Sequence, residues 1–333
     1  MAVKKLRAAI LGFGGMGHCH AAQYAKQKNV RLVAVCDINQ KQLETAEMSI
    51  NLGNTGKTDM SNLNKYLSYE ELIKNEALDF IDICLPTDLH AKYSIRAMKD
   101  GFNVLCEKPM ALNVRDCDKM IATAEKTGKL LMIAQCLRFN RDFEYVRETM
   151  KNGSLGKLIR LSLHRAGGMP GGWFRDVSRS GGALMDLHIH DLDYVLSLLG
   201  KPQYLACFGN TVKSGGIDDL TANMVYADGV TVGAESSWAR GTFNGTMSAM
   251  FEQGTIELGS GLKIYRIDQP IEEVKFDGKN DNMYFNEIAY FAECVKNKVQ
   301  PERCLPASTR ETIRMIIEEI RSANAGGKKI TIK

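Results

Sequence analysis

A glycine-rich turn near the N-terminus limits the folds that this chain can adopt. An apolar run at residues 7–11 is followed by Gly12, Phe13, Gly14, Gly15, Met16 and Gly17, and then by a stretch with helical character at residues 18–28. A second apolar run, residues 32–36, ends in Asp37. The glycine spacing alone is weak evidence, but strand, glycine turn, helix and acid in this order form the dinucleotide-binding fingerprint.

The chemistry of this fingerprint predicts the cofactor. Glycines let the backbone approach a pyrophosphate, and the helix N-terminus offers free N–H groups and the positive end of a dipole. Asp37 can accept hydrogen bonds from the adenosine ribose hydroxyls and would repel a 2′-phosphate. NAD is therefore predicted over NADP, with an ordinary turn residue as the alternative for Asp37.

The alternation of strands and helices continues to residue 134. Strands are expected at 78–85, 103–106 and 130–134, and helices at 89–99 and 114–127, the second with Asn113 as N-cap and Gly128 as C-cap. A capping box at residues 68–71 opens a further short helix. Alternation of this kind predicts a Rossmann domain over residues 1–134, with a doubly wound parallel sheet. Ligands of such sheets lie beyond the carboxyl ends of the strands. The expected cofactor contacts there are Pro86, Thr87, His90, Glu107, Lys108 and Pro109.

Three histidines of this half have open interpretations. His90 could contact the nicotinamide ribose or simply occupy the first turn of a helix. His18 and His20 flank Cys19 and invite a metal interpretation. Residues two apart on a helix point in different directions, so structural roles are favoured and no metal is predicted.

Residues 135–333 have a different pattern, which predicts an α+β domain. A helix is expected from Arg138 to about residue 151, a strand at 157–164, a loop at 165–180 and a helix at 181–193. Six strands between residues 204 and 267 predict a large open, mostly antiparallel sheet. Helices at 283–296 and 306–325 and a short strand at 330–332 complete the domain.

The helix expected at 181–193 carries a candidate proton-transfer pair. Asp186 and His190 are four residues apart and share one helical face, with Asp193 one turn further along. A carboxylate beside an imidazole fixes its tautomer and raises its pKa, as general acid–base work near neutrality requires. A buried structural pair and a metal site are the alternatives, but no third ligand is suitably spaced and His188 faces the opposite way.

These motifs together resemble the glucose–fructose oxidoreductase/inositol dehydrogenase (Gfo/Idh/MocA) family. The resemblance implies that Lys108 hydrogen-bonds the reacting hydroxyl, that His190 is the acid/base, that Asp186 orients substrate and histidine, and that Pro109 lies near the nicotinamide. The loop at 167–173 is where members diverge, so the substrate cannot be identified from it. The substrate-binding residues expected are Lys108, Arg138, Trp173, Asp186, His190 and Asp193.

Composition restricts the remaining possibilities. The net charge of the 333-residue chain is +4, its basic residues are dispersed, and no apolar run could span a bilayer, so neither nucleic acid nor membrane is an expected partner. The nine cysteines occur singly, which predicts a reduced, cytoplasmic protein. An open sheet usually needs covering, so a homodimer or homotetramer is expected.

The function predicted from the sequence is NAD-dependent oxidation of a secondary alcohol of a sugar, inositol or related polyol. One alternative is a redox glycosidase of the same family, which would retain NAD and release no net NADH. The other is a non-catalytic NAD-binding sensor or scaffold.

Overall fold

The computed structural model describes residues 5–50, 53–54, 58–276 and 282–333. The chain forms two compact units, the first made of residues 1–136 and 282–311 and the second of residues 137–281 and 312–333. In the described parts of the chain, no helix has both the length and the apolar character needed to cross a membrane.

The first unit contains a six-stranded parallel sheet in the order β5-β2-β1-β6-β7-β8. From β1 the sheet extends through β2 to β5, and from β6 it extends the other way through β7 to β8. The strand order therefore reverses between β1 and β6. This confirms the predicted doubly wound sheet and places its ligand crevice at the carboxyl ends of β1 and β6. The strands are β1 (Leu6–Leu11), β2 (Val30–Cys36), β5 (Asn64–Tyr66), β6 (Phe80–Ile83), β7 (Asn103–Glu107) and β8 (Leu131–Ala134).

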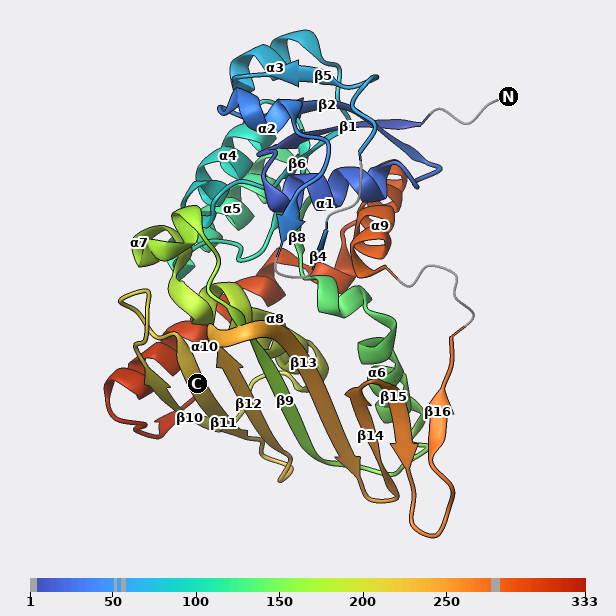
Figure 1. The fold of residues 1–333 in the computed structure, drawn as a ribbon, viewed down its shortest axis with the longest axis vertical. Coiled ribbons are helices and arrows are strands. Elements are labelled where there is room, and N and C mark those ends of the chain that lie inside the picture. The colour runs from blue at the N-terminus through green and yellow to red at the C-terminus, as the bar shows by residue number, and fades with distance from the viewer. Residues whose placement is uncertain (1–4, 51–52, 55–57, 277–281) are drawn as a thin grey trace. The chain divides into compact units, whose positions relative to one another are not determined.

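Helices cover both faces of this sheet. Because crossovers are right-handed and the strand order runs in two directions, α1 (Gly15–Tyr24) lies on one face of the sheet. Helices α4 (Thr87–Lys99) and α5 (Val114–Thr127) lie on the other face, side by side in Figure 1. Shorter helices α2 (Gln40–Glu44) and α3 (Tyr69–Asn75) follow β2 and β5, and β3 (Ser49–Ile50) pairs antiparallel with β4 (Gly53–Asn54).

Several helix ends match their sequence signals. The Ser68 hydroxyl accepts a hydrogen bond from the Glu71 N–H at 3.2 Å, and the Asn113 side chain accepts one from the Asp116 N–H at 2.9 Å. Gly128 ends α5 with φ of 65°, a left-handed conformation that glycine adopts without strain. Local capping chemistry therefore fixes these boundaries.

Helix α9 (Met283–Asn297) belongs to the first unit, although the sequence pattern divided the chain once, at residue 134. The Gln27 amide donates to the Phe285 carbonyl at 2.9 Å, and the Asn29 amide donates to Glu293 at 2.6 Å. The rings of Phe80 and Phe291 also meet edge to face, with centroids 5.3 Å apart. These contacts join residues more than 200 positions apart, which local patterns do not reveal.

The second unit contains a nine-stranded sheet in the order β16-β15-β14-β13-β9-β12-β11-β10-β17. Its β9–β12 pairing is parallel and its other pairings are antiparallel, so the sheet is mixed, as well as large and mostly antiparallel as predicted. The strands are β9 (Leu158–Gly168), β10 (Tyr204–Asn210), β11 (Asp219–Val225), β12 (Thr231–Ser237), β13 (Ala239–Phe251), β14 (Gly254–Gly259), β15 (Gly261–Tyr265), β16 (Glu272–Val274) and β17 (Ile330–Thr331).

Two features of this sheet were absent from the sequence prediction. Strand β13 begins at Ala239, whereas the prediction began at residue 246, and β16 was not predicted. The early part of β13 contains Gly241, Asn244 and Gly245, which lower β-propensity, and its pairing with β9 shifts register between Ala239 and Asn244. Partner strands, rather than local propensity, make this segment extended.

The two faces of the nine-stranded sheet differ. Alternate residues of β10–β12 are buried, such as Leu205, Ala222 and Ala234. On this face Ser322 of α10 (Pro306–Asn324) accepts a hydrogen bond from the Cys207 N–H at 2.9 Å. The opposite face carries polar residues, among them Ser162, Asn223 and Glu235, and lies towards the viewer in Figure 1.

The remaining helices of the second unit are α6 (Arg141–Asn152), α7 (Val177–Ser180) and α8 (Ile189–Leu199), with short turns η1 (Cys136–Phe139), η2 (Gly172–Arg175) and η3 (Leu184–His188). A further short turn, η4 (Glu302–Cys304), lies in the first unit.

Candidate active site

Two glycines at the junction of β1 and α1, Gly12 and Gly17, cannot be replaced without displacing backbone. Gly12 has φ of +96°, and a Cβ there would lie 2.6 Å from the Cys84 carbonyl oxygen. A Cβ on Gly17 would lie 2.3 Å from the Gly12 carbonyl oxygen, whereas one on Gly14 would meet nothing within 4 Å. Helix α1 has no side-chain cap at Gly14, so its first N–H groups suit a phosphate.

Asp37 lies at the carboxyl end of β2, beside this loop. Its carboxylate accepts hydrogen bonds from the Phe13 N–H and the Asn39 N–H, each at 2.8 Å. The structure therefore brings the predicted acid and the glycine turn together. Its contact with the adenosine ribose stays a prediction, together with contacts by Phe13, Gly15 and Met16.

Residues after β6 and β7 lie at the same sheet edge. Pro86 and Thr87 begin α4, and Thr87 is buried. His90 is also buried, and its ring nitrogens contact two backbone carbonyls, with Nδ1 2.7 Å from the Pro109 oxygen and Nε2 2.7 Å from the Leu85 oxygen. Burial lowers the pKa of His90, and the opposing effect of the two carbonyls is smaller, so the pKa lies below its ordinary value. A neutral imidazole has one N–H, so His90 donates to one of these carbonyls and packs against the other. Its contact with the nicotinamide ribose stays a prediction.

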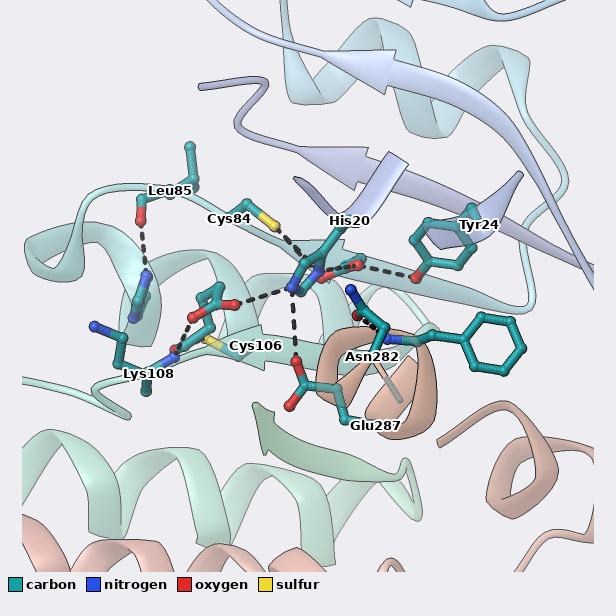
Figure 2. Close-up of polar contacts among 12 residues, drawn as sticks. His20, Tyr24, Cys84, Leu85, Cys106, Lys108, Asn282 and Glu287 are labelled. Atoms are coloured by element: carbon teal, nitrogen blue, oxygen red, sulfur yellow. Dashed lines mark hydrogen bonds and ion pairs between the residues drawn. The ribbon is translucent and has the colours of Figure 1, made fainter. Parts of the chain in front are cut away.

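Lys108 follows β7 and leads into a cis peptide bond with Pro109. Its backbone N–H donates to Glu107 Oε2 at 3.0 Å. The side chain of Lys108 is partly exposed, and Figure 2 shows its ammonium pointing away from His20 and Glu287. The loop thus presents the lysine while Glu107 turns back into the protein.

A buried polar cluster beneath this loop was missed by sequence reasoning. It consists of His20, Asp82, Glu107 and Glu287, each at most 6% exposed. His20 Nδ1 lies 2.8 Å from Asp82 Oδ2, and His20 Nε2 lies 3.0 Å from Glu107 Oε1. The available sequence signal was Asp82, a carboxylate inside an otherwise apolar strand, because a buried charge requires a partner.

The His190-bearing segment of the second unit is not one regular α-helix. Residues Leu184–His188 form a π-helix, which continues into α8 at Ile189. The sequence predicted continuous helix over 181–193, and spacing rules cannot reveal the wider turn. Asp186 lies within the π-helix, His190 lies one residue into α8, and both are partly exposed. Short π-helical turns are frequent at functional sites.

Buried ion pairs hold this segment in place. Arg138 donates to Asp193 twice, from Nε at 2.7 Å and from Nη2 at 2.8 Å, and Thr312 Oγ1 donates to the same carboxylate at 2.9 Å. Arg165 donates to Asp191 at 2.9 and 2.8 Å. With Arg138 5% and Asp193 1% exposed, the geometry favours a positioning role for both. Their direct contact with substrate stays a prediction.

His188 faces away from the predicted site, as expected. It is buried, with Nε2 3.1 Å from Glu319 Oε2 and Nδ1 3.1 Å from the Ser236 hydroxyl. Burial lowers the pKa of His188, but the charge and hydrogen bond of Glu319 outweigh it and raise the pKa overall. Trp173 lies in η2, partly exposed and stacked on Phe174 with ring centroids 3.9 Å apart. Its substrate contact stays a prediction.

Comparison with known protein families matches both halves of the chain. Residues 6–135 match the family model described as "Oxidoreductase family, NAD-binding Rossmann fold", and residues 143–257 match the "GFO/IDH/MocA C-terminal domain". The chain belongs to the Gfo/Idh/MocA oxidoreductase family. This confirms the resemblance identified from the motifs, and NAD is the cofactor that the Rossmann unit of the family binds.

Relatives within the Gfo/Idh/MocA family include sugar and polyol dehydrogenases. The chain is 27% identical over 272 residues to myo-inositol 2-dehydrogenase of Thermotoga maritima, covering 80% of this chain and 72% of the relative. It is 29% identical over 242 residues to D-glucoside 3-dehydrogenase of Escherichia coli, covering 71% and 66%. The crystal structure of myo-inositol 2-dehydrogenase from Lactobacillus plantarum matches with a TM-score of 0.82 at 25% identity, covering 99% and 100%.

The glycine loop fits the cofactor of this family. Gly12 lets the loop lie against the Cys84 backbone, and Gly17 lets α1 lie against the Gly12 carbonyl. The open space at Gly14 leaves room for a phosphate beside the first turn of α1. In the described residues, two groups also place three metal-binding atoms within 4.8 Å of one another, namely His20, Asp82 and Cys84, and His20, Glu107 and Glu287. Both groups share His20, whose ring nitrogens already face Asp82 and Glu107.

Proposed function

We propose that this protein oxidises a secondary alcohol of a sugar, inositol or related polyol, using NAD. The observation that carries the proposal is the family match over both halves, with relatives that act as inositol and glucoside dehydrogenases. The site geometry agrees, since the glycine loop and Asp37 suit the dinucleotide and Lys108 extends from the loop after β7.

The reaction removes a hydride from carbon and a proton from oxygen. NAD, when bound, accepts the hydride at nicotinamide C4. Lys108 donates a hydrogen bond to the reacting hydroxyl and stabilises the developing alkoxide, which lowers the pKa of that hydroxyl. His190 accepts the hydroxyl proton, and Asp186 orients both the histidine and a neighbouring substrate hydroxyl. General acid–base help of this kind contributes about 10²–10⁴-fold.

The test is a screen for NADH formation at 340 nm over inositols, aldoses, glucosides and sugar acids. We expect turnover with at least one class of polyol, and a loss of about 10²-fold or more in kcat for Lys108→Ala and His190→Ala. NADH affinity should change little in either variant. Wild-type turnover by both variants on the best substrate would refute these roles.

Two outcomes would assign a different function. Cleavage of a chromogenic glycoside without added cofactor and without net NADH would show a redox glycosidase. Binding of NADH with no turnover across the whole panel would show a sensor or scaffold.

We also propose that the protein is a homodimer or homotetramer in a reducing compartment such as the cytoplasm. The polar face of the nine-stranded sheet, which includes Asn223 and Glu235, offers an extended surface for a second copy. The nine cysteines, all within the described residues, form no disulfide. Light scattering coupled to size-exclusion chromatography tests the assembly, and a mass of 37.0 kDa in solution would refute it.

A further inference from the structure

A fully buried imidazole lies at the centre of the first unit's polar cluster. His20, from α1, contacts carboxylates from two strands, Asp82 Oδ2 at 2.8 Å and Glu107 Oε1 at 3.0 Å. The Tyr24 hydroxyl also donates to Asp82, at 2.9 Å. In Figure 2, dashed lines also join the His20 imidazole to Cys84 and Glu287. The contact with Asp82 is a hydrogen bond, whereas the contact with Glu107 is an ion pair without hydrogen-bond alignment, so charge attraction links His20 to Glu107.

Glu107 connects this cluster to the backbone of Lys108. Its Oε1 faces His20, and its Oε2 accepts the Lys108 N–H at 3.0 Å. The carboxylate is 5% exposed, so water competes little for either oxygen. The His20 imidazole is therefore linked by charge, through the Glu107 side chain, to the backbone of the residue that carries the ammonium.

His90 holds the other end of the same loop. Its Nδ1 lies 2.7 Å from the carbonyl oxygen of Pro109, the residue after Lys108. Its Nε2 lies 2.7 Å from the Leu85 carbonyl oxygen, in the loop that follows β6. Proline has no N–H, so this carbonyl is the one backbone polar group that Pro109 offers. The buried His90 ring thus lies against the backbone after Lys108, and Glu107 holds the backbone N–H before it.

Glu287 of α9 is the fourth member of the cluster, and its protonation state affects the net charge around His20. It is 0% exposed, its Oε1 lies 3.8 Å from His20 Nε2, and neither oxygen has a hydrogen-bond partner among the described residues. Burial and the charge of Glu107 raise the pKa of Glu287 well above its ordinary value, although His20 lowers it. A neutral Glu287 leaves the His20 imidazole to pair with Asp82 and Glu107.

We propose that His20, acting through Glu107, and His90, acting through the Pro109 carbonyl, are positioning residues that fix the Lys108 ammonium for its reaction with the substrate hydroxyl. The inference depends on the role proposed for Lys108. A displacement of about 1 Å in a reacting group can cost on the order of 10²-fold in rate, so tight fixing of this loop matters for turnover.

The test is a double-mutant cycle between Glu107→Gln and Lys108→Ala. The glutamine keeps an oxygen for the Lys108 N–H but loses the charge that pairs with His20. We expect Glu107→Gln to lower kcat by about 10-fold or more in the wild-type background and by less than about 2-fold in the Lys108→Ala background. His90→Gln should behave in the same way. KM for the substrate should change much less than kcat.

Glu76→Gln is the matched control, because Glu76 is also a buried carboxylate of the first unit. It pairs with Arg7 at 2.9 Å and accepts from the Tyr66 hydroxyl at 2.9 Å, and in the described part of the chain its polar contacts do not include the Lys108 loop. This variant should lose stability and keep the wild-type kcat of its folded fraction. If it loses as much kcat as Glu107→Gln, general destabilisation explains the effect and the inference fails.

The outcomes separate the inference from the proposed function. An unimpaired Lys108→Ala variant would refute the role of Lys108 itself. An impaired Lys108→Ala variant, with Glu107→Gln and His90→Gln losses that multiply with it, would refute the positioning. A stoichiometric metal ion in the purified protein, lost in Glu287→Gln, would also overturn it, since the cluster would then be a metal site. Circular dichroism confirms that each variant is folded.

Discussion

Glu287 gives the most quantitative prediction, because the substitution Glu287→Gln imitates its protonated form. The groups that face it are His20 of α1, Asp82 of β6 and Glu107 of β7. Burial is the largest cause of its raised pKa, followed by repulsion from Glu107. At a pH below the ordinary value of 4.5, Glu287 is neutral in both folded and unfolded states. There the variant and the wild type should be about equally stable.

The sign of the pH dependence follows from proton binding. Above about pH 5.5 the unfolded chain has released the Glu287 proton, while the folded protein retains it until the pH passes the raised pKa. Folding then takes up one proton, so wild-type stability falls as the pH rises. The free energy of unfolding should fall by about 1.4 kcal/mol per pH unit relative to Glu287→Gln, until the pH reaches the folded-state pKa.

The assay is urea unfolding of both proteins at half-unit steps from pH 4.5 to 7.5, with the free energy of unfolding compared at each pH. Other titrating groups are common to both proteins and cancel in the difference. We expect the variant's advantage to grow steadily with pH. A difference that stays flat across this range would refute the neutral, buried state of Glu287, and one that falls with pH would show an ionised carboxylate with a stabilising partner.

Three further predictions concern other parts of the structure. Gly12→Ala should lower the free energy of unfolding in urea by about 1–3 kcal/mol and weaken NADH binding measured by fluorescence, because the added Cβ would lie 2.6 Å from the Cys84 carbonyl oxygen. A wild-type free energy of unfolding and wild-type NADH affinity would contradict the packing argument. Asp37→Ser should raise the ratio of kcat/KM with NADP to that with NAD by about 10-fold or more, since it removes a carboxylate that repels the 2′-phosphate; an unchanged ratio would count against the ribose contact. Arg138→Met should lower the free energy of unfolding by about 3–5 kcal/mol, because the buried Asp193 carboxylate would keep the Thr312 hydroxyl but lose its cation. Adding Asp193→Leu should recover much of that loss, and additive losses would disprove the pairing argument.

Local patterns predicted the first unit well because each of its signals acts over a few residues. The helix at 114–127 begins and ends where Asn113 and Gly128 indicated. The glycine turn and Asp37 came together as expected, because their positions follow from strand order alone. Fold class and cofactor could therefore be predicted from the sequence.

The features that the sequence did not predict depend on contacts between residues far apart in the chain. The proximity of Glu287 to His20 depends on α9 joining the first unit, and no periodicity indicates that. The Arg138–Asp193 pair joins residues 55 positions apart, so Asp193 was expected to hold substrate although the structure gives it a buried partner. Buried charges in apolar segments, such as Asp82, are the sequence signal for networks of this kind.

The most direct measurement for the proposed activity is hydride transfer from a labelled substrate. myo-Inositol deuterated at every carbon would be incubated with the protein and NAD, and the nicotinamide product analysed by mass spectrometry. We predict NADH that carries one deuterium at C4, formed by the wild type and about 10²-fold more slowly by Lys108→Ala. The same incubation with a deuterated glucoside covers the other class of relative. Turnover of either substrate without deuterium in the nicotinamide would contradict the account.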